Sequence, residues 1–435
     1  MTVRPDSQNG DADLLTIKLE KLVYGGDALG RLSGGQAVFV PFGLPGEKVK
    51  ARVVEEKHGH VRAELVEVLE PSPQRIAPKC KHFGICGGCH YQHLPYQAQL
   101  QAKTNILRDQ LMRIGKIPNP PVEPIIASPS EWNYRNHVQF HLTREGKLGY
   151  IQANSRGVVP ISECHLPEAS LNDLWPSLEF DPGLGLERIS LRVGVEDETM
   201  LVLESEDPEP PELELETNLS VVHLTGGDMV VMAGEDALSI SVKDRLFRVS
   251  AASFFQVNTR SGHFTGMAGK MVDYLLEYLP VSSKTTMLDV YCGVGLFSAF
   301  FAGRVGRLIG VEASPSACED FATNLDDFDN VALYEAPAEA VLPSLDVAPD
   351  VVILDPPRAG LEKRALQALL AQGPARIAYV SCDPSTLGRD AARLIAGGYR
   401  CLRVTPFDLF PQTRSIESIS IFEKEPFNGN DATRV

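Results

Sequence analysis

The chain has 435 residues, and 57 Asp and Glu against 41 Lys and Arg give it a formal net charge of −16. This length exceeds one typical domain, so we expect two or three domains, each with its own core. The sequence has no run of 18 apolar residues, and its first 13 residues are mostly polar. These features argue against a membrane-spanning helix and are not typical of a signal peptide. We therefore expect a cytoplasmic protein, and we expect it to be a monomer.

The charge is distributed unevenly along the chain. Residues 71–164 contain 11 Lys and Arg against five Asp and Glu, whereas residues 168–249 contain 19 acidic residues against five basic ones. A surface that binds phosphate groups needs local positive potential rather than a positive total charge. The acidic total therefore does not exclude a nucleic-acid partner.

Residues 14–70 predict a small β-barrel. Apolar and polar residues alternate in short runs, and paired glycines at 25–26 and 34–35 separate these runs. About five strands in so short a segment are typical of an oligonucleotide-binding barrel. Prolines at 71, 73 and 78 then indicate a linker.

Two further domains are expected. Residues 71–250 begin with clustered cysteines and a helix over 96–114, and then read mostly as strands, which predicts a mainly β central domain. A helix over 264–279 follows, and strands then alternate with helices, which is typical of a parallel sheet covered on both faces. We therefore predict domains at 14–70, 71–250 and 251–426.

The third domain carries features of a nucleoside-binding site. A buried strand at 286–290 runs into Gly293-Val294-Gly295, where glycines let the backbone approach a ligand. Glu312 ends the second strand, where an acid can accept hydrogen bonds from ribose hydroxyls, and Asp355 follows the third strand at the same edge. A tight turn without a ligand remains the alternative. Ser298 stands where a dinucleotide fingerprint has its third glycine, so a pyrophosphate is not favoured.

Cys382 and Glu417 are the candidate catalytic residues. Cys382 follows the strand 377–380 and precedes a helix, whose N-terminus can stabilise a thiolate. A thiolate at a ligand site indicates covalent catalysis. Glu417 precedes the final strand, 419–422, and lies at the same edge if that strand is antiparallel. There it is a candidate base, with an ordinary exposed carboxylate as the alternative.

Five motifs in order make this sequence similar to the RNA uracil-5-methyltransferase family, whose bacterial members modify 23S ribosomal RNA or transfer RNA. They are Ser253-Phe-Phe-Gln-Val-Asn258, Asp289-Val-Tyr-Cys-Gly-Val-Gly295, Asp355-Pro-Pro-Arg-Ala-Gly360, Ser381-Cys-Asp-Pro384 and Phe410-Pro-Gln-Thr413 with Ile416-Glu417. Two positions depart from the family pattern, Ser415 in place of a frequent histidine and Leu296 in place of a frequent asparagine.

This resemblance implies a fold and a reaction. The barrel is expected to be a TRAM RNA-binding domain, and the last domain a Rossmann-like class I methyltransferase domain. S-adenosylmethionine would supply the methyl group for carbon 5 of a uridine, with ribosomal RNA as the first expected substrate. Cys382 is implied as the nucleophile and Glu417 as the base. The resemblance implies that S-adenosylmethionine is held by Gln256, Tyr291, Glu312 and Asp355.

The chemistry explains why both a thiolate and a base are needed. Carbon 5 of uracil is a poor nucleophile until a thiolate adds to carbon 6, and the proton on carbon 5 must later be removed. A uridine in folded RNA must also leave its stack to reach the thiolate. We expect phosphate contacts in the barrel and in the basic stretch from Lys79 to Arg156, which includes Arg135. Tyr134 or Trp132 is a candidate to stack a base, with core packing as the alternative.

Four cysteines predict a metal site. Cys80, Cys86 and Cys89 lie close together in the sequence, and Cys164 is the distant fourth. Four thiolates can hold either zinc or a 4Fe–4S cluster, and the spacing alone does not choose. The family resemblance implies the 4Fe–4S cluster. We expect it to have a structural or RNA-shaping role.

Other functions remain open at this point. Transfer RNA is the alternative substrate. A cytosine-5 methyltransferase would use the same adduct chemistry, although such enzymes usually pair a second cysteine with the nucleophile. The alternatives from other classes are an iron–sulfur RNA-binding protein without catalysis and a redox sensor.

Overall fold

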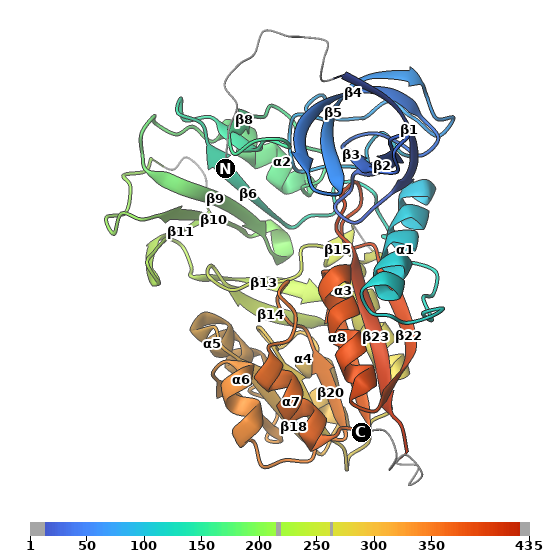
Figure 1. Ribbon diagram of the computed structural model, residues 1–435. Coiled ribbons are helices and arrows are strands. Elements are labelled where there is room, and N and C mark those ends of the chain that lie inside the picture. The colour runs from blue at the N-terminus through green and yellow to red at the C-terminus, as the bar shows by residue number, and fades with distance from the viewer. Residues whose placement is uncertain (1–13, 215–218, 262–263, 427–435) are drawn as a thin grey trace.

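The computed structural model describes residues 14–214, 219–261 and 264–426. Its first part is a closed barrel with the strand order β1-β2-β3-β5-β4, so the predicted barrel is confirmed (Figure 1). Val38, Val40 and Val49 are fully buried in its centre, as expected from their alternation with polar residues. The strands are β1 (Leu14–Leu22), β2 (Ala28–Arg31), β3 (Ala37–Val40), β4 (Lys48–Lys57) and β5 (His60–Glu70).

The helix predicted over 96–114 is α1 (Tyr96–Arg113), and it packs against the C-terminal part of the chain. Its buried face, with Leu107 and Leu111, shares one core with Leu387 and Leu394 of α8 (Pro384–Ala396). Residues 121–126 then run beside β22 (Tyr399–Phe407), joined to it by backbone hydrogen bonds. Part of the segment predicted as the central domain therefore completes the C-terminal core, and the three domain limits stay a prediction.

The middle part of the chain forms a seven-stranded sheet, the central sheet, in the order β12-β11-β10-β9-β6-β7-β8. Only β10 and β11 pair in parallel among its neighbouring strands. Leu171 and Trp175 pack into the core of this sheet from a short helix and the turn after it. The elements are β6 (His137–Leu142), β7 (Leu148–Ile151), β8 (Val158–Pro160), α2 (Ala169–Leu174), β9 (Leu186–Val193), β10 (Thr199–Ser205), β11 (Ser220–Thr225) and β12 (Asp228–Ala233).

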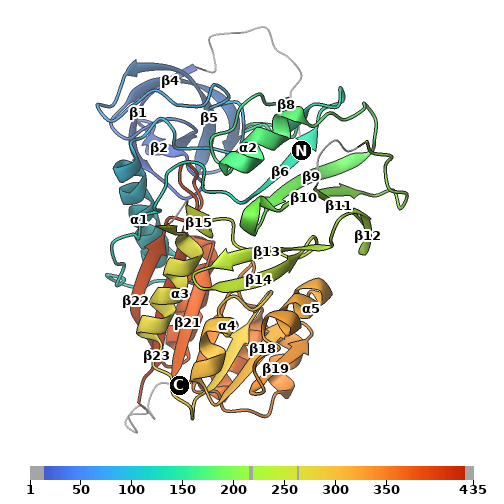
Figure 2. The ribbon, with the colours of Figure 1, turned by 180° about the vertical axis from the view of Figure 1, so that it is seen from behind.

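A hairpin of β13 (Ala237–Val242) and β14 (Arg245–Ser250) joins the central sheet to the C-terminal part, and Figure 2 shows it between the two. Phe247 and Val249 of β14 belong to the C-terminal core. Asp320 accepts hydrogen bonds from the Ser250 backbone N–H at 2.8 Å and from the Ser253 hydroxyl at 2.6 Å. The hairpin is thus fixed to α5 (Pro315–Asn324), the helix that carries Asp320.

The C-terminal sheet has the order β19-β18-β17-β20-β21-β23-β22. The first five strands in that order run parallel, and β23 runs antiparallel to β21 and β22, which meets the condition stated for Glu417. The strands are β17 (Thr286–Val290), β18 (Arg307–Glu312), β19 (Val331–Glu335), β20 (Val351–Leu354), β21 (Arg376–Ser381) and β23 (Glu417–Lys424). Two minimal strands, β15 (Arg260–Ser261) and β16 (Phe264–Thr265), precede this sheet.

Helices cover both faces of this sheet, as predicted. One core contains side chains of α3 (Met267–Tyr278), α4 (Ser298–Phe301) and α5, and the other contains side chains of α1, α6 (Ala338–Val341), α7 (Lys363–Gln372) and α8. Neighbouring strand residues contribute to opposite cores, as Met287 and Leu288 do. The helix expected from residue 264 begins at Met267. The carboxyl ends of the parallel strands therefore meet at one edge, where the candidate site residues lie.

Candidate active site

The turn after β17 has a left-handed backbone conformation, which residues other than glycine rarely adopt. Tyr291 has a φ of 65°, and Gly293 and Gly295 have φ of 53° and 89°. The Tyr291 N–H donates to the Val311 carbonyl at 2.8 Å, which holds this turn against β18. A non-glycine residue in the left-handed region is uncommon and occurs often at ligand sites. The predicted Gly-x-Gly turn is therefore present at the carboxyl edge of the sheet.

Glu312 closes the neighbouring strand β18 and organises the same turn. One carboxylate oxygen accepts from the Gly293 N–H at 2.9 Å, and the other accepts from the N–H groups of Ala313 and Ser314 at 2.7 and 2.8 Å. A carboxylate has about four lone-pair sites, so one remains for a ligand hydroxyl. This position agrees with the role predicted for Glu312, which stays a prediction.

Three carboxyl groups lie close together beneath this turn. Burial, together with the smaller effect of the nearby charges of Asp289 and Glu312, raises the pKa of Asp355 to about 7. Burial likewise raises the pKa of Asp289 to about 6, although hydrogen bonds from Ser298 oppose the rise. The second oxygen of Asp289 is buried without a hydrogen-bond partner among the described residues. Such a concentration of acids favours a positively charged ligand.

Gln256 lies between β14 and α3, outside the parallel strands. Its side chain is buried, and its backbone carbonyl accepts a hydrogen bond from the Asn136 side-chain amide at 3.4 Å. Asn136 also donates to the Thr259 hydroxyl at 2.8 Å, so the central sheet fixes this segment. The ligand role predicted for Gln256 stays a prediction.

The structure brings Cys382 and Glu417 together. Ser381, the last residue of β21, pairs with Ser418 of the antiparallel strand β23. Cys382 follows Ser381 and Glu417 precedes Ser418, so the two side chains start from opposing positions at the sheet edge. Cys382 is half-buried and Glu417 is buried. The alternative of an exposed carboxylate at Glu417 is therefore wrong.

The surroundings of both groups favour their neutral forms. Burial, together with the smaller effect of the carboxylates of Glu417 and Asp355, raises the pKa of the Cys382 thiol to about 12. Burial also raises the pKa of Glu417 well above its usual range, and Asp355 adds to this rise. The Arg358 guanidinium lowers the pKa of both groups. Arg358 is therefore the residue of the Asp355-Pro-Pro-Arg segment that favours the reactive, ionised forms.

A buried ion pair fixes the segment 408–416 that leads to Glu417. The Lys103 ammonium of α1 lies 2.6 Å from an Asp408 carboxylate oxygen and donates to the Phe410 carbonyl at 2.9 Å. Neither side chain of the ion pair is exposed to solvent. Gln99, one turn earlier on α1, exchanges hydrogen bonds with Gln412 at 2.9 and 3.0 Å. These contacts, between residues more than 300 positions apart, carry no local signal in the sequence.

The four predicted metal ligands line one cavity of about 270 Å³, together with Arg135 and Tyr150. All four are free thiols, and burial raises the pKa of each, the pKa of Cys86 to about 11 and that of Cys89 to about 12. The Arg135 charge lowers the pKa of Cys89 and Cys164. Within residues 14–214, 219–261 and 264–426, however, no three His, Cys, Asp or Glu side chains stand in a metal-binding arrangement. The structure thus places the cysteines around one space without showing a metal site.

The candidates for RNA stacking and phosphate contact are mostly engaged elsewhere. Tyr134 is fully buried and its hydroxyl donates to the Pro411 carbonyl at 3.0 Å, so core packing is the correct interpretation. The Arg135 guanidinium lies 5.7 Å from the centre of the Phe410 ring and lines the cysteine cavity. Trp132 is half-buried, with the Lys79 ammonium 5.0 Å from its ring centre.

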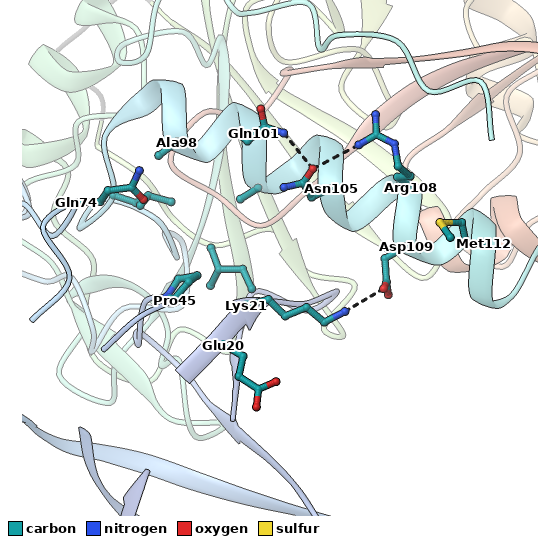
Figure 3. Close-up of a pocket in the computed structure, with 13 residues that line it drawn as sticks. Glu20, Lys21, Pro45, Gln74, Ala98, Gln101, Asn105, Arg108, Asp109 and Met112 are labelled. Carbon is teal, nitrogen blue, oxygen red and sulfur yellow. Dashed lines mark hydrogen bonds and ion pairs between the residues drawn. The ribbon is translucent and has the colours of Figure 1, made fainter. Parts of the chain in front are cut away.

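A second cavity, of about 490 Å³, lies between the barrel and α1. Figure 3 shows the Lys21–Asp109 ion pair of 3.0 Å that crosses it. Asn105 accepts hydrogen bonds from Gln101 and Arg108 on the wall that α1 forms. The residues that line this cavity do not include any of the predicted site residues.

Comparison with known proteins assigns the class. Residues 13–66 match the TRAM domain, so the barrel is a TRAM domain, and residues 342–425 match the tRNA (Uracil-5-)-methyltransferase family. An uncharacterized RNA methyltransferase of Aquifex aeolicus is 35% identical over 94% of this chain and 98% of its own length. One of Halalkalibacterium halodurans is 33% identical over 94% of this chain and 97% of its own length. The chain belongs to this family of RNA methyltransferases, and the resemblance to uracil-5-methyltransferases is confirmed.

A solved structure shares the fold along nearly the whole chain. The crystal structure of Pyrococcus abyssi tRNA (uracil-54, C5)-methyltransferase in complex with S-adenosyl-L-homocysteine superimposes with a TM-score of 0.71. It covers 93% of this chain and 99% of that chain, at 24% identity. Among the described residues, no helix is both long and apolar enough to span a membrane.

Proposed function

We propose that this protein transfers a methyl group from S-adenosylmethionine to carbon 5 of a uridine in RNA, through a covalent bond between Cys382 and the uracil. The observation that carries this proposal is the pairing of β21 with β23, which sets the Cys382 thiol opposite the Glu417 carboxyl. A nucleophile and a proton acceptor at the same sheet edge are the two groups that the reaction needs.

The proposed reaction has three steps: addition of the thiolate, methyl transfer and elimination. The Cys382 thiolate forms a bond to carbon 6, and the electron pair of the carbon 5–carbon 6 double bond moves to give an enolate. Carbon 5 then takes the methyl group from the sulfonium donor, which leaves as the neutral thioether. Glu417 removes the proton on carbon 5, the double bond reforms, and the Cys382 thiolate leaves. Glu417 then releases this proton to solvent, and the Cys382 thiolate is free to take up a proton or to react again.

The acids beside the Gly-x-Gly turn suit the methyl donor. S-adenosylmethionine supplies a methyl group on a positively charged sulphur. In our proposal Glu312 accepts from a ribose hydroxyl, and Asp355, Tyr291 and Gln256 enclose the rest of the ligand. A bound cation would lower the raised pKa values of Asp355 and Glu417 and so favour their ionised forms.

The cysteine cavity supports a proposal of a 4Fe–4S cluster held by Cys80, Cys86, Cys89 and Cys164. Four thiols around one cavity match the number of ligands that such a cluster needs, and the Arg135 cation would favour the thiolate forms of Cys89 and Cys164. We assign the cluster no step in the reaction. Zinc remains the alternative for the same four ligands.

The substrate RNA has two candidates. We propose 23S ribosomal RNA as the substrate. Transfer RNA is the second candidate because the matched family is described as tRNA (Uracil-5-)-methyltransferase and the structural neighbour modifies tRNA. In either RNA the uridine must leave its stack to reach the half-buried Cys382.

Nucleoside mass spectrometry tests the reaction and the substrate together. Ribosomal RNA and transfer RNA lacking the modification are incubated with the protein and labelled S-adenosylmethionine. We expect labelled 5-methyluridine in one RNA class, loss of the label in Cys382→Ala and retention of it in Cys401→Ala, whose thiol lies on β22. Labelled 5-methylcytidine would instead support the cytosine alternative. Absence of label from both RNAs would support a non-catalytic RNA-binding protein.

A further inference from the structure

The turn between β1 and β2 of the TRAM barrel contacts the segment that follows Cys382 and the segment that leads to Glu417. The Tyr24 hydroxyl donates a hydrogen bond to the Asp383 carboxylate, and the Arg414 guanidinium donates to the Gly25 carbonyl at 2.8 Å. Gly26 packs closely against Arg414: a Cβ atom added at Gly26 would lie 3.0 Å from the Arg414 Cβ. The barrel therefore forms part of the surroundings of the catalytic residues.

Asp383 couples Tyr24 to the position of the nucleophile. It follows Cys382 directly, and one of its carboxylate oxygens accepts from the N–H groups of Ser385 and Thr386, each at 2.9 Å, which caps α8. The other oxygen accepts from Tyr24. The hydroxyl of Tyr24 is thus anchored one residue away from the candidate nucleophile.

The Tyr24 residue nevertheless remains 44% exposed. Two exposed arginines lie near it: Arg414 donates to the neighbouring Gly25 carbonyl, and the charges of Arg358 and Arg414 both lower the Tyr24 pKa against the larger, raising effect of burial. An aromatic ring with a fixed hydroxyl and an accessible face is a suitable stacking surface for a base. Two guanidinium groups beside it supply local positive charge in a chain whose net charge is −16.

We propose that Tyr24 forms one wall of the entrance to the Cys382 site, where its ring stacks on a base of the RNA next to the modified uridine. Arg358 and Arg414 contact the adjoining phosphates. This inference rests on the proposed function for the identity of the ligand, a uridine-containing RNA strand. It makes Tyr24 a residue that binds substrate, in addition to joining the barrel to the catalytic domain.

Binding of a single strand tests the role of the ring apart from the chemistry. The probe is a fluorescein-labelled oligouridylate of about ten nucleotides, and the full-length protein carries Cys382→Ala so that no adduct forms. Tyr24→Ala should weaken binding on the order of tenfold, as expected for the loss of one base-stacking contact. Tyr24→Phe keeps the ring and should bind within about twofold of the parent.

A matched control and a second measurement complete the test. Tyr334 is 40% exposed on β19, at the far edge of the sheet, and Tyr334→Ala should bind as the parent does. Photocross-linking of the same strand carrying 5-iodouridine should attach it to the peptide that contains Tyr24. Thermal melting establishes that each variant is folded.

Three results would overturn the inference. They are unchanged binding by Tyr24→Ala, equal weakening by Tyr24→Phe and Tyr24→Ala, and cross-links only to other peptides. Equal weakening would mean that the hydroxyl bond to Asp383 matters and the ring does not. Failure of the proposed function is distinguishable, because it would appear as absent methyl transfer by the protein with Cys382 intact, whatever the strand binds.

Discussion

At the residue scale, the site combines a nucleophile and a base whose pKa values the surrounding protein raises. The pKa of Cys382 is raised to about 12 and that of Glu417 is raised well above its usual range, chiefly by burial. Ionised forms of both are needed for the proposed reaction, so activity should increase with pH. Arg358 opposes both shifts, which makes it the residue that sets where this increase occurs.

Replacement of Arg358 should therefore move the pH profile. Below its pKa, the thiolate fraction of a cysteine rises about tenfold per pH unit. Arg358→Ala removes a charge that lowers both pKa values, so both values rise and the ionised fractions at neutral pH fall. We expect a slower single-turnover rate at pH 7 under saturating RNA, with much of the loss recovered toward pH 9.

Two controls separate this effect from RNA binding. Arg358→Lys keeps the positive charge and should retain most of the rate, and Arg307→Ala removes an exposed arginine at the start of β18, the opposite end of that strand from Glu312. A uniform loss at every pH in Arg358→Ala would contradict the electrostatic role.

Most predicted site residues could be placed from sequence because they end parallel strands. Such strand ends must meet at one edge, which brings Tyr291, Glu312 and Asp355 together. Tyr24 could not be found in this way. Its contact with Asp383 joins residues 359 positions apart, and nothing in its local pattern distinguishes it from other turn residues.

At the element scale, the periodicity of apolar residues predicted where helices form, but not which sheet each helix packs against. Helix α1 has a clear buried face in the sequence, yet that pattern does not say which sheet covers it. The buried Lys103–Asp408 pair shows why the C-terminal sheet does so. It ties α1 to the segment before Glu417, and a buried charge without its partner is strongly destabilising.

The loops that carry the four cysteines allow a test of the proposed cluster. Protein purified without oxygen should contain about four iron and four sulfide per chain if Cys80, Cys86, Cys89 and Cys164 hold a 4Fe–4S cluster. Cys164→Ala should lose both, and Cys401→Ala should keep them. One zinc per chain without sulfide would support the zinc alternative, and the absence of any metal would contradict both proposals.

At the scale of the whole molecule, the TRAM barrel sits above the catalytic edge of the C-terminal sheet (Figure 1). The sequence predicted the barrel and the α/β sheet from two separate patterns, of period two and of alternating strands and helices. It could not predict their contact, because the glycine pair at 25–26 indicates a turn but not the distant segment that the turn contacts. The arrangement gives an acidic protein a local group of aromatic and basic residues at the site entrance.

The central claim is the covalent bond between Cys382 and the uracil, and mass spectrometry of the Glu417→Gln variant tests it most directly. A glutamine cannot accept the proton on carbon 5, so the methylated adduct should persist. After incubation with S-adenosylmethionine and substrate RNA, followed by nuclease and protease digestion, we expect the peptide with Cys382 to carry a methylated uridine nucleotide. Glu425→Gln, on the same C-terminal segment, should release its product. Methyl transfer to RNA without any adduct on Cys382 would contradict the account.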